Sequence, residues 1–279
     1  MSVTTKAGSD GFKWFFGVVE DRNDEKMLGR VRVRVYNTHP QQKSLVNTGD
    51  LHWATVIMPP TSAGTSQIGS SPTGMVVGTT VFGFFADAGE SQIPIVLGTL
   101  AGIPKQGHDV PVEARGTSSV SKTALGPEPA SAFGAKYPYN KVTKTEGGHI
   151  IEVDDTPGAE RLHVYHKSGT YVEIAPDGRL VTKTAGSRFD VTVGEQTVYI
   201  GGTATIQVQG DVNMTVVGTV TGSASSWNLT GDVNVTGNIN ATAEITDKTS
   251  SMTSMRATFN AHDHADPQGG KVSPTSGTM

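Results

Sequence analysis

Apolar and polar residues alternate strictly through much of the last third of the chain. From Val198 to Ala224 every even position is apolar or glycine, and nearly every odd position is polar. A period of two indicates β-structure whose side chains face opposite sides in turn. The alternation lasts some 27 residues, whereas an ordinary strand has roughly 5–6. The run therefore predicts a long repetitive β-structure.

A second repeat coincides with the first, because Gly194, Gly202, Gly210 and Gly218 are spaced by eight residues. A fixed period indicates stacked units, none of which buries its apolar face alone. Eight residues are too few for a coil of a single-chain β-helix. They suit one strand and one turn of a prism whose other walls come from other chains, with glycine at each corner. We expect an intertwined homotrimer. The alternatives are a secreted β-solenoid and a disordered Thr/Gly tract, and the alternation disfavours disorder.

The apolar parity changes once along this region. After Ser226 the apolar positions become odd, from Trp227 to Ile245. Because a one-residue shift turns every side chain to the other face, we expect a bulge or strand crossing near residues 225–227. No proline occurs between residues 177 and 266, which fits continuous strand pairing.

Five shorter segments near the N-terminus have strand patterns separated by Gly and Pro turns. They suit a small barrel of the OB type, and they cover residues 12–19, 29–35, 52–58, 79–85 and 93–98. In the second segment apolar and basic residues alternate: Val31, Val33 and Val35 with Arg30, Arg32 and Arg34. The arginine stripe is either a phosphate-binding or single-stranded DNA face, or a solvated or subunit-facing strand, and we expect partner contact.

Residues 101–145 are rich in Gly, Pro, Ser and Ala without a sustained period, which indicates a linker. Strand signals return from residue 146. The predicted fold class is all-β: an N-terminal OB-fold barrel, then an intertwined trimeric β-helix or prism with a pointed tip. The expected parts are the barrel, the linker, neck strands, the trimeric β-helix and a metal-binding tip, at 1–100, 101–145, 146–180, 181–247 and 248–279.

Composition excludes several classes of protein and site. The 279 residues carry a net charge of −4 and no cysteine. The charge argues against a protein held on nucleic acid by bulk electrostatics. The lack of cysteine excludes a disulfide framework, thiolate zinc sites and a cysteine nucleophile. No apolar run approaches the roughly 18 residues of a membrane-spanning helix, and residues 1–10 lack the apolar core of a secretion signal.

Several motifs resemble one family. The segments Trp14–Arg22, Leu28–Val35 and Thr38–Pro40 resemble the N-terminal OB domain of the T4-type central spike proteins of contractile phage tails. The motifs in 148–161 and 166–171 resemble the region before the needle in phage spikes and in type VI secretion (VgrG) spikes. The resemblance implies a central tail spike in the virion baseplate, whose barrel docks to a hub protein and whose needle breaches the host outer membrane mechanically. A type VI or related injection spike is the alternative, and a barrel enzyme or nucleic-acid binder with a solenoid tail is a third class.

One departure bears on catalysis. The T4-type spike has a lysozyme domain between barrel and needle, but here only about 45 residues separate them, too few for that enzyme. We therefore expect no enzyme and no catalytic residue. Four residues around a turn are candidates for catalysis or a second metal, and the resemblance implies that they are neck structure: Asp154, Asp155, His163 and His166.

The sharpest local signal is His262-Asp263-His264 near the C-terminus. In an extended strand both histidines face one side, and three chains on a three-fold axis offer six imidazoles. Six ligands close an octahedral shell, unlike the four of structural zinc, which favours Fe or Ni. Resemblance to short phage spikes with an apical His-x-His site implies one iron ion per trimer. Asp263 is expected to point away, and residues 266–270 to turn the tail back over the tip.

Overall fold

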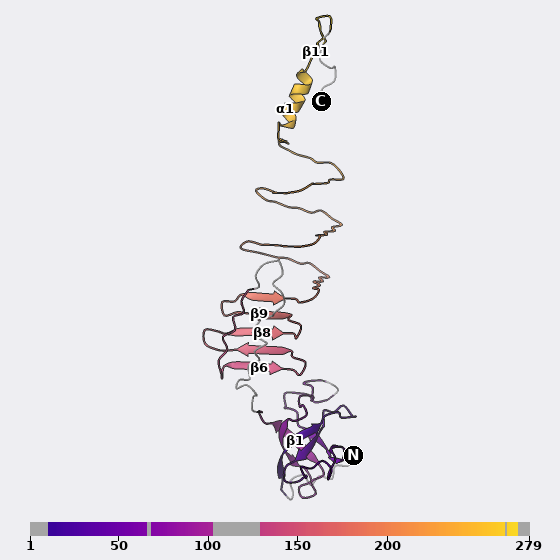
Figure 1. Ribbon diagram of the computed structural model, residues 1–279, viewed down its shortest axis with the longest axis vertical. Helices are drawn as coiled ribbons and strands as arrows, with labels where there is room; N and C mark the ends of the chain where they lie inside the picture. Colours follow the sequence, from indigo (N-terminus) through magenta and orange to yellow (C-terminus); the bar gives the residue numbers. More distant parts are fainter. Residues whose placement is uncertain (1–10, 66–67, 103–128, 266, 273–279) are drawn as a thin grey trace. The chain divides into compact units, whose positions relative to one another are not determined.

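A computed structural model describes residues 11–65, 68–102, 129–265 and 267–272 (Figure 1). Within these ranges the regular structure is almost entirely β-strand, with one α-helix near the C-terminus, which confirms the all-β prediction. None of the helices in the described ranges has the length and apolarity needed to cross a membrane.

The first five strands close into a barrel in the order β1-β2-β3-β5-β4. Only the β3–β5 pair is parallel. All five strands predicted from the alternation are present, and a 3-10 turn, η1 (Thr48–Asp50), lies between the second and third. Their bounds are β1 Lys13–Asp21, β2 Val31–Val35, β3 Trp53–Val56, β4 Thr80–Phe85 and β5 Pro94–Thr99.

The barrel core follows the period-two pattern. Val31, Val33 and Val35 are each at most 2% exposed and face the interior, as the sequence predicts. Gly83 on β4 allows the closest packing there, because a Cβ at this position would lie 2.1 Å from the Ile95 carbonyl oxygen. Every larger residue would push β4 away from β5.

A second, antiparallel sheet follows, in the order β10-β9-β8-β7-β6 (Figure 1). Its strands are β6 Asn140–Lys144, β7 Ile150–Asp154, β8 Arg161–Tyr165, β9 Tyr171–Ile174 and β10 Leu180–Lys183. The linker boundary expected at residue 145 needs correction, because β6 lies before it and pairs with β7. The part of the expected linker at 103–128 lies outside the described residues.

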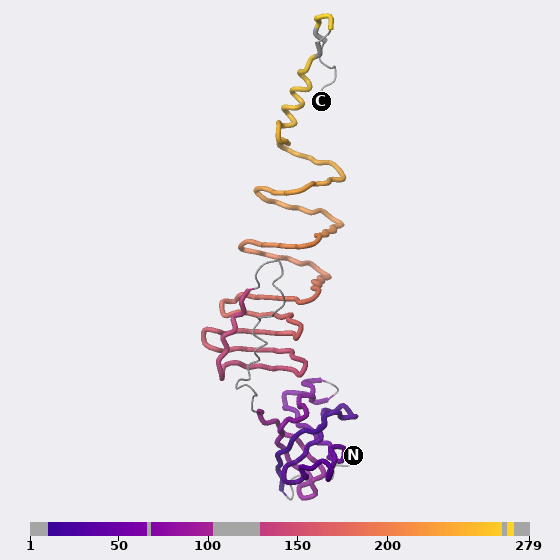
Figure 2. The backbone as a smooth tube through the Cα atoms, viewed as in Figure 1, coloured from indigo at the N-terminus to yellow at the C-terminus, as the bar shows by residue number. Residues whose placement is uncertain are grey.

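Residues 184–245 form no strand ladder within their own chain, and Figure 2 shows them as successive wide bends. The backbone bends at 193–194, 201–202, 209–210 and 217–218, which reproduces the eight-residue glycine period. Neighbouring valines point in opposite directions: Val216 is 47% exposed and Val217 105%. At this pair the odd position is the more exposed one, as the alternation predicts.

A local irregularity accompanies the change of parity. The chain bends at Ser225. The Trp227 ring folds back so closely that a Cβ on Gly222 would lie 2.6 Å from it. Glycine at 222 therefore makes room for the tryptophan where the apolar face changes from even to odd positions.

The C-terminal part contains α1 (Met252–Ala261), which our sequence analysis does not anticipate. Ser251 is its N-cap, and the Ser251 hydroxyl accepts a hydrogen bond from the Ser254 amide. A short hairpin follows, β11 (His264–Ala265) and β12 (Lys271–Val272). Its turn, with Gly269 at φ +85°, folds the chain back as expected for residues 266–270.

Candidate functional site

The second sheet leaves an aliphatic face open to solvent in the single chain. Its residues form two cross-strand rows over β7, β8 and β9. Their exposed fractions lie between 37% and 57%, which is high for side chains packed side by side on a sheet. The residues are Ile151, Val164 and Val172 in one row and Val153, Leu162 and Ile174 in the other. A contiguous apolar surface of this kind marks an interaction site.

The opposite face of the same sheet is charged and buried. Glu152, His163 and Glu173 stand directly opposite one another on three adjacent strands. Arg161 bridges the two glutamates: its Nη1 donates to Glu173 at 2.8 Å and its Nη2 donates to Glu152. None of these four side chains is more than 1% exposed. Sequence reasoning missed this network because a sheet with one aliphatic and one charged face ordinarily buries the aliphatic one.

A segment at 129–139, here called the strap, runs across the strands of the second sheet (Figure 2) and contacts its charged face. The Glu173 carboxylate accepts hydrogen bonds from the Ser131 hydroxyl at 2.6 Å and the Ala132 amide at 3.1 Å. The Phe133 ring lies 5.0 Å from the Arg161 guanidinium. Burial raises the pKa of Glu173, but the hydrogen bonds from Ser131 and Arg161 outweigh it, so the pKa lies below its ordinary value of 4.5.

The four acidic and histidine residues weighed for catalysis do not converge. The buried Asp154 carboxylate accepts the Thr156 amide at 2.9 Å. Asp155 pairs with Lys141 in solvent. His163 is buried, with its Nδ1 3.7 Å from Glu152, whereas the exposed His166 contacts Ser168. They are parts of the neck sheet and its turns, as the sequence analysis expects.

The arginine stripe of β2 is used within the barrel domain. Arg34 is 3% exposed and pairs with Glu20 at 2.8 Å, and its Nη atoms donate to the carbonyls of Pro40 and Val46. Arg32 donates to the Leu51 carbonyl at 2.8 Å. These arginines hold the loop at 36–51 against the barrel.

Two carboxylates anchor the stripe. The hydrogen bond from Arg34, with those from Thr48 and Lys43, lowers the pKa of Glu20 from 4.5 to about 2, against the opposing effect of burial. Arg30 pairs with Asp24 at 2.6 Å and lowers the pKa of that carboxyl well below its usual range. The guanidinium groups are thus engaged by carboxylates and carbonyls rather than presented to phosphate.

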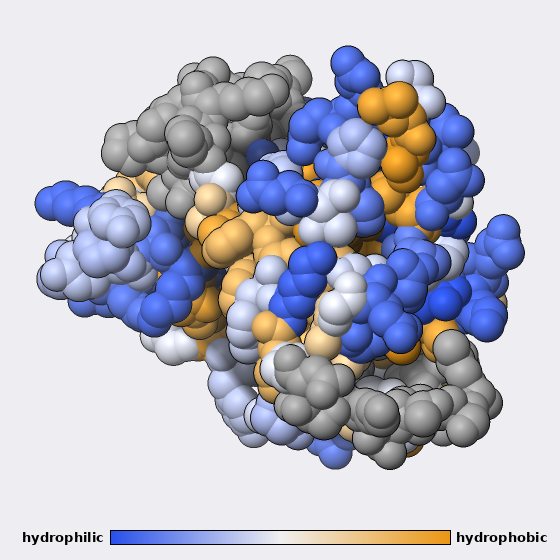
Figure 3. Space-filling view, turned by 90° about the horizontal axis from the view of Figure 1, so that it is seen from below, coloured by the Kyte–Doolittle hydropathy of each residue, from blue (hydrophilic) through white to orange (hydrophobic). Residues whose placement is uncertain are grey.

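An aromatic ladder lies on the outer surface of the barrel. Its aromatic residues alternate in sequence with the core residues of β1 and β4. Phe12, Trp14 and Phe16 are about half exposed, between 47% and 54%. The rings are in contact, with Trp14 stacked on Phe82 at 5.4 Å and 7°. The members are Phe12, Trp14, Phe16, Phe82 and Phe84. Hydrophobic residues also interrupt the hydrophilic surface in the space-filling view (Figure 3).

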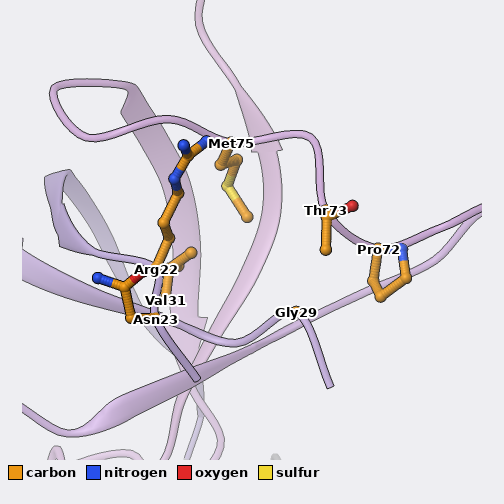
Figure 4. Close-up of a pocket in the computed structure, with 7 residues that line it drawn as sticks. All are labelled: Arg22, Asn23, Gly29, Val31, Pro72, Thr73 and Met75. Carbon is orange, nitrogen blue, oxygen red and sulfur yellow. The ribbon is translucent and has the colours of Figure 1, made fainter. Parts of the chain in front are cut away.

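A small pocket of the barrel does not resemble an active site. It lies where the 72–75 segment passes the β1–β2 turn, and the Pro72 ring faces Gly29 (Figure 4). Among its seven lining residues only Arg22 carries a charge. The pocket therefore lacks an acid–base pair for hydrolysis.

The predicted tip residues lie where α1 ends. His262 is the C-cap of α1 and has extended backbone, with φ −70° and ψ 141°. Its Nδ1 contacts the Phe259 carbonyl oxygen. His264 follows in β11.

The predicted histidine pair does not form a metal-binding group within the described part of the chain. No group of three His, Cys, Asp or Glu side chains gathers among the residues that the structure describes. His262 and His264 therefore stay a predicted ligand pair, and they are short of a complete metal site by themselves. A metal bound there would cross-link the chain ends.

Comparison with known proteins identifies relatives. Residues 37–119 match the family described as Gp5 N-terminal OB domain. The chain is 36% identical to Protein Gp5 of Vibrio phage KVP40, over an alignment covering 73% of this chain and 65% of that protein. It is 48% identical over 103 residues to the pre-baseplate central spike protein Gp5 of Enterobacteria phage T4, which covers 35% of this chain and 18% of that protein. The chain is thus similar in one segment to the Gp5 N-terminal OB domain, and over most of its length to the Gp5 protein of a phage, whose counterpart in phage T4 is a pre-baseplate central spike protein.

Proposed function

We propose that this chain forms a homotrimeric central spike at the distal end of a contractile phage tail, within the virion baseplate. The observation that carries the proposal is the aliphatic face of the second sheet, followed in sequence by the alternating apolar positions that begin at Val198. Two further copies would bury these faces and supply the strand partners that one chain lacks.

The barrel attaches the spike to the baseplate hub protein. The aromatic ladder supports this role, because large exposed aromatic side chains are typical anchors of protein interfaces. The arginine stripe does not support nucleic-acid binding, since Arg32 and Arg34 are occupied by the barrel's own loop and Glu20.

The needle and tip act mechanically. Three chains that share one ladder form a stiff rod, which transmits the force of tail contraction to the host outer membrane without catalysis. His262 and His264 of three copies would hold one ion, and iron suits six imidazoles. The ion would supply a rigid cross-link at the apex. Both relatives named above are phage proteins, which favours a phage tail over a type VI secretion spike.

Introducing one charged side chain into the aliphatic face tests the proposed interface between chains. Val164 lies in the centre of the aliphatic face, so Val164→Asp should convert the full-length trimer to monomers, as measured by light scattering. Lys167→Asp, in the exposed turn after β8, is the matched control and should stay trimeric. A trimer of unchanged mass and thermal stability in Val164→Asp would contradict the proposed interface.

A further inference from the structure

The apolar residues of α1 form a seam of the coiled-coil type. Met252, Met255 and Phe259 follow one another at intervals of three and four residues, which places them at alternating a and d positions of a heptad. They are 37%, 52% and 37% exposed, and no residue of the helix is buried. An open groove runs beside Met255, Phe259 and His262.

The helix needs packing partners. Its ten residues are fewer than the roughly 12–15 that even favourable sequences need to be helical alone in water. Its first turn has a good N-cap in Ser251, so the start of the helix is well defined. Burial of the apolar seam against other helices would supply the stability that the isolated helix lacks.

The position of α1 identifies its partner. The Met252 amide donates to the Ile245 carbonyl at 3.0 Å, so the helix is joined directly to the last residue of the alternating run. Chains that meet along that run bring their α1 helices together at its end, in the same orientation. The opposite face of α1 carries Thr253, Ala257 and Asn260, which offer no comparable apolar stripe.

We propose that α1 from three copies of this chain packs as a short parallel three-helix coil that closes the prism. This inference rests on the proposed trimer. Phe259 then fills the seam below His262, whose ring lies 5.1 Å from it. The coil also fixes where each chain leaves its helix, because His262 is the residue that ends α1. The helix thereby sets the place of the metal ligands, which an extended strand alone would leave undefined.

Cysteine cross-linking tests the arrangement, since the chain has no native cysteine. In full-length protein, Met255→Cys places thiols in the seam, and Ala257→Cys places them on the outer face as the matched control. Both proteins are treated with diamide and separated on a denaturing gel. Seam cysteines of neighbouring helices come within disulfide reach, whereas outer ones do not.

We expect a covalent two-chain band from Met255→Cys and single chains from Ala257→Cys. Light scattering of the same samples separates the possible failures. A trimer without the Met255→Cys cross-link, or with equal cross-linking of both variants, overturns the coil but not the trimer. A monomer overturns both.

A charge in the seam provides a second test. Met255→Glu should speed hydrogen exchange of the α1 amides at least tenfold, while Ala257→Glu should leave it within about twofold, because glutamate at both sites has similar helix propensity. Equal effects of the two variants would show that α1 has no buried seam.

Discussion

Replacing Glu173 by glutamine should release the strap from the second sheet. The carboxylate accepts hydrogen bonds from Ser131, Ala132 and Arg161. Glutamine keeps the size of the side chain but removes its charge, so that Arg161 retains only Glu152 as an anionic partner. Removing one member of a buried ion pair costs about 3–5 kcal/mol, because the remaining charge stays desolvated.

Hydrogen exchange followed by mass spectrometry measures this release where it occurs. A peptide containing the amides of residues 131–133 should exchange more than about 100-fold faster in Glu173→Gln, since about 1.4 kcal/mol corresponds to a factor of ten. The amides of the central strand β8 should change far less, because their ladder bonds remain intact.

Asp155→Asn is the matched control on the same sheet. Its ion pair with Lys141 is exposed, with side chains 52% and 70% accessible, and such pairs contribute about 0–1 kcal/mol. Exchange of the strap should therefore stay within about fivefold of the unmodified protein. If Glu173→Gln behaves like this control, the ionic network does not hold the strap, and the reasoning is refuted.

Three further outcomes follow from the described contacts. The pKa of Glu20 is lowered from 4.5 to about 2, so its ionised form stabilises the fold fully above pH 4.5. About 3 kcal/mol of this stability should be lost as the pH falls through about 2. The loss should appear as faster amide exchange in the loop at 36–51. Trp14→Ala should weaken binding of the tail's hub protein at least tenfold in a titration while the barrel keeps its circular dichroism, and unchanged affinity would remove the ladder from the interface. Joint replacement of His262 and His264 by alanine should abolish the bound metal in elemental analysis and leave the trimer intact, whereas unchanged metal would place the ion elsewhere.

Strand positions were predictable where burial imposed a period. The spacing of Val31, Val33 and Val35 correctly predicts which side of β2 faces the barrel interior. The eight-residue glycine spacing matches the backbone bends between residues 193 and 218. β6 escaped detection because its sequence, Asn140–Lys144, is short and polar, as expected of an edge strand. Its position depends on pairing with β7, which the local pattern does not encode.

Long-range contacts account for the remaining differences. The alternation of β2 predicts that Arg34 points away from the barrel core. It does not predict that the loop at 36–51 folds back over Arg34 and accepts its hydrogen bonds. For α1, the signals were the Ser251 cap and the spacing of Met252, Met255 and Phe259, which the surrounding period of two obscured. The buried network around Arg161 depends on the strap, whose Ser131 and Ala132 lie 42 and 41 residues before their partner Glu173 in the sequence.

The mass of the native particle tests the central claim most directly. Light scattering of the purified full-length protein should give three times the chain mass of 29.2 kDa, independent of concentration over a wide dilution range. Interlocked chains should also separate slowly, so the trimer should persist after dilution for hours. A mass of 29.2 kDa in native buffer would contradict the shared ladder, the aliphatic interface and the three-fold metal site together.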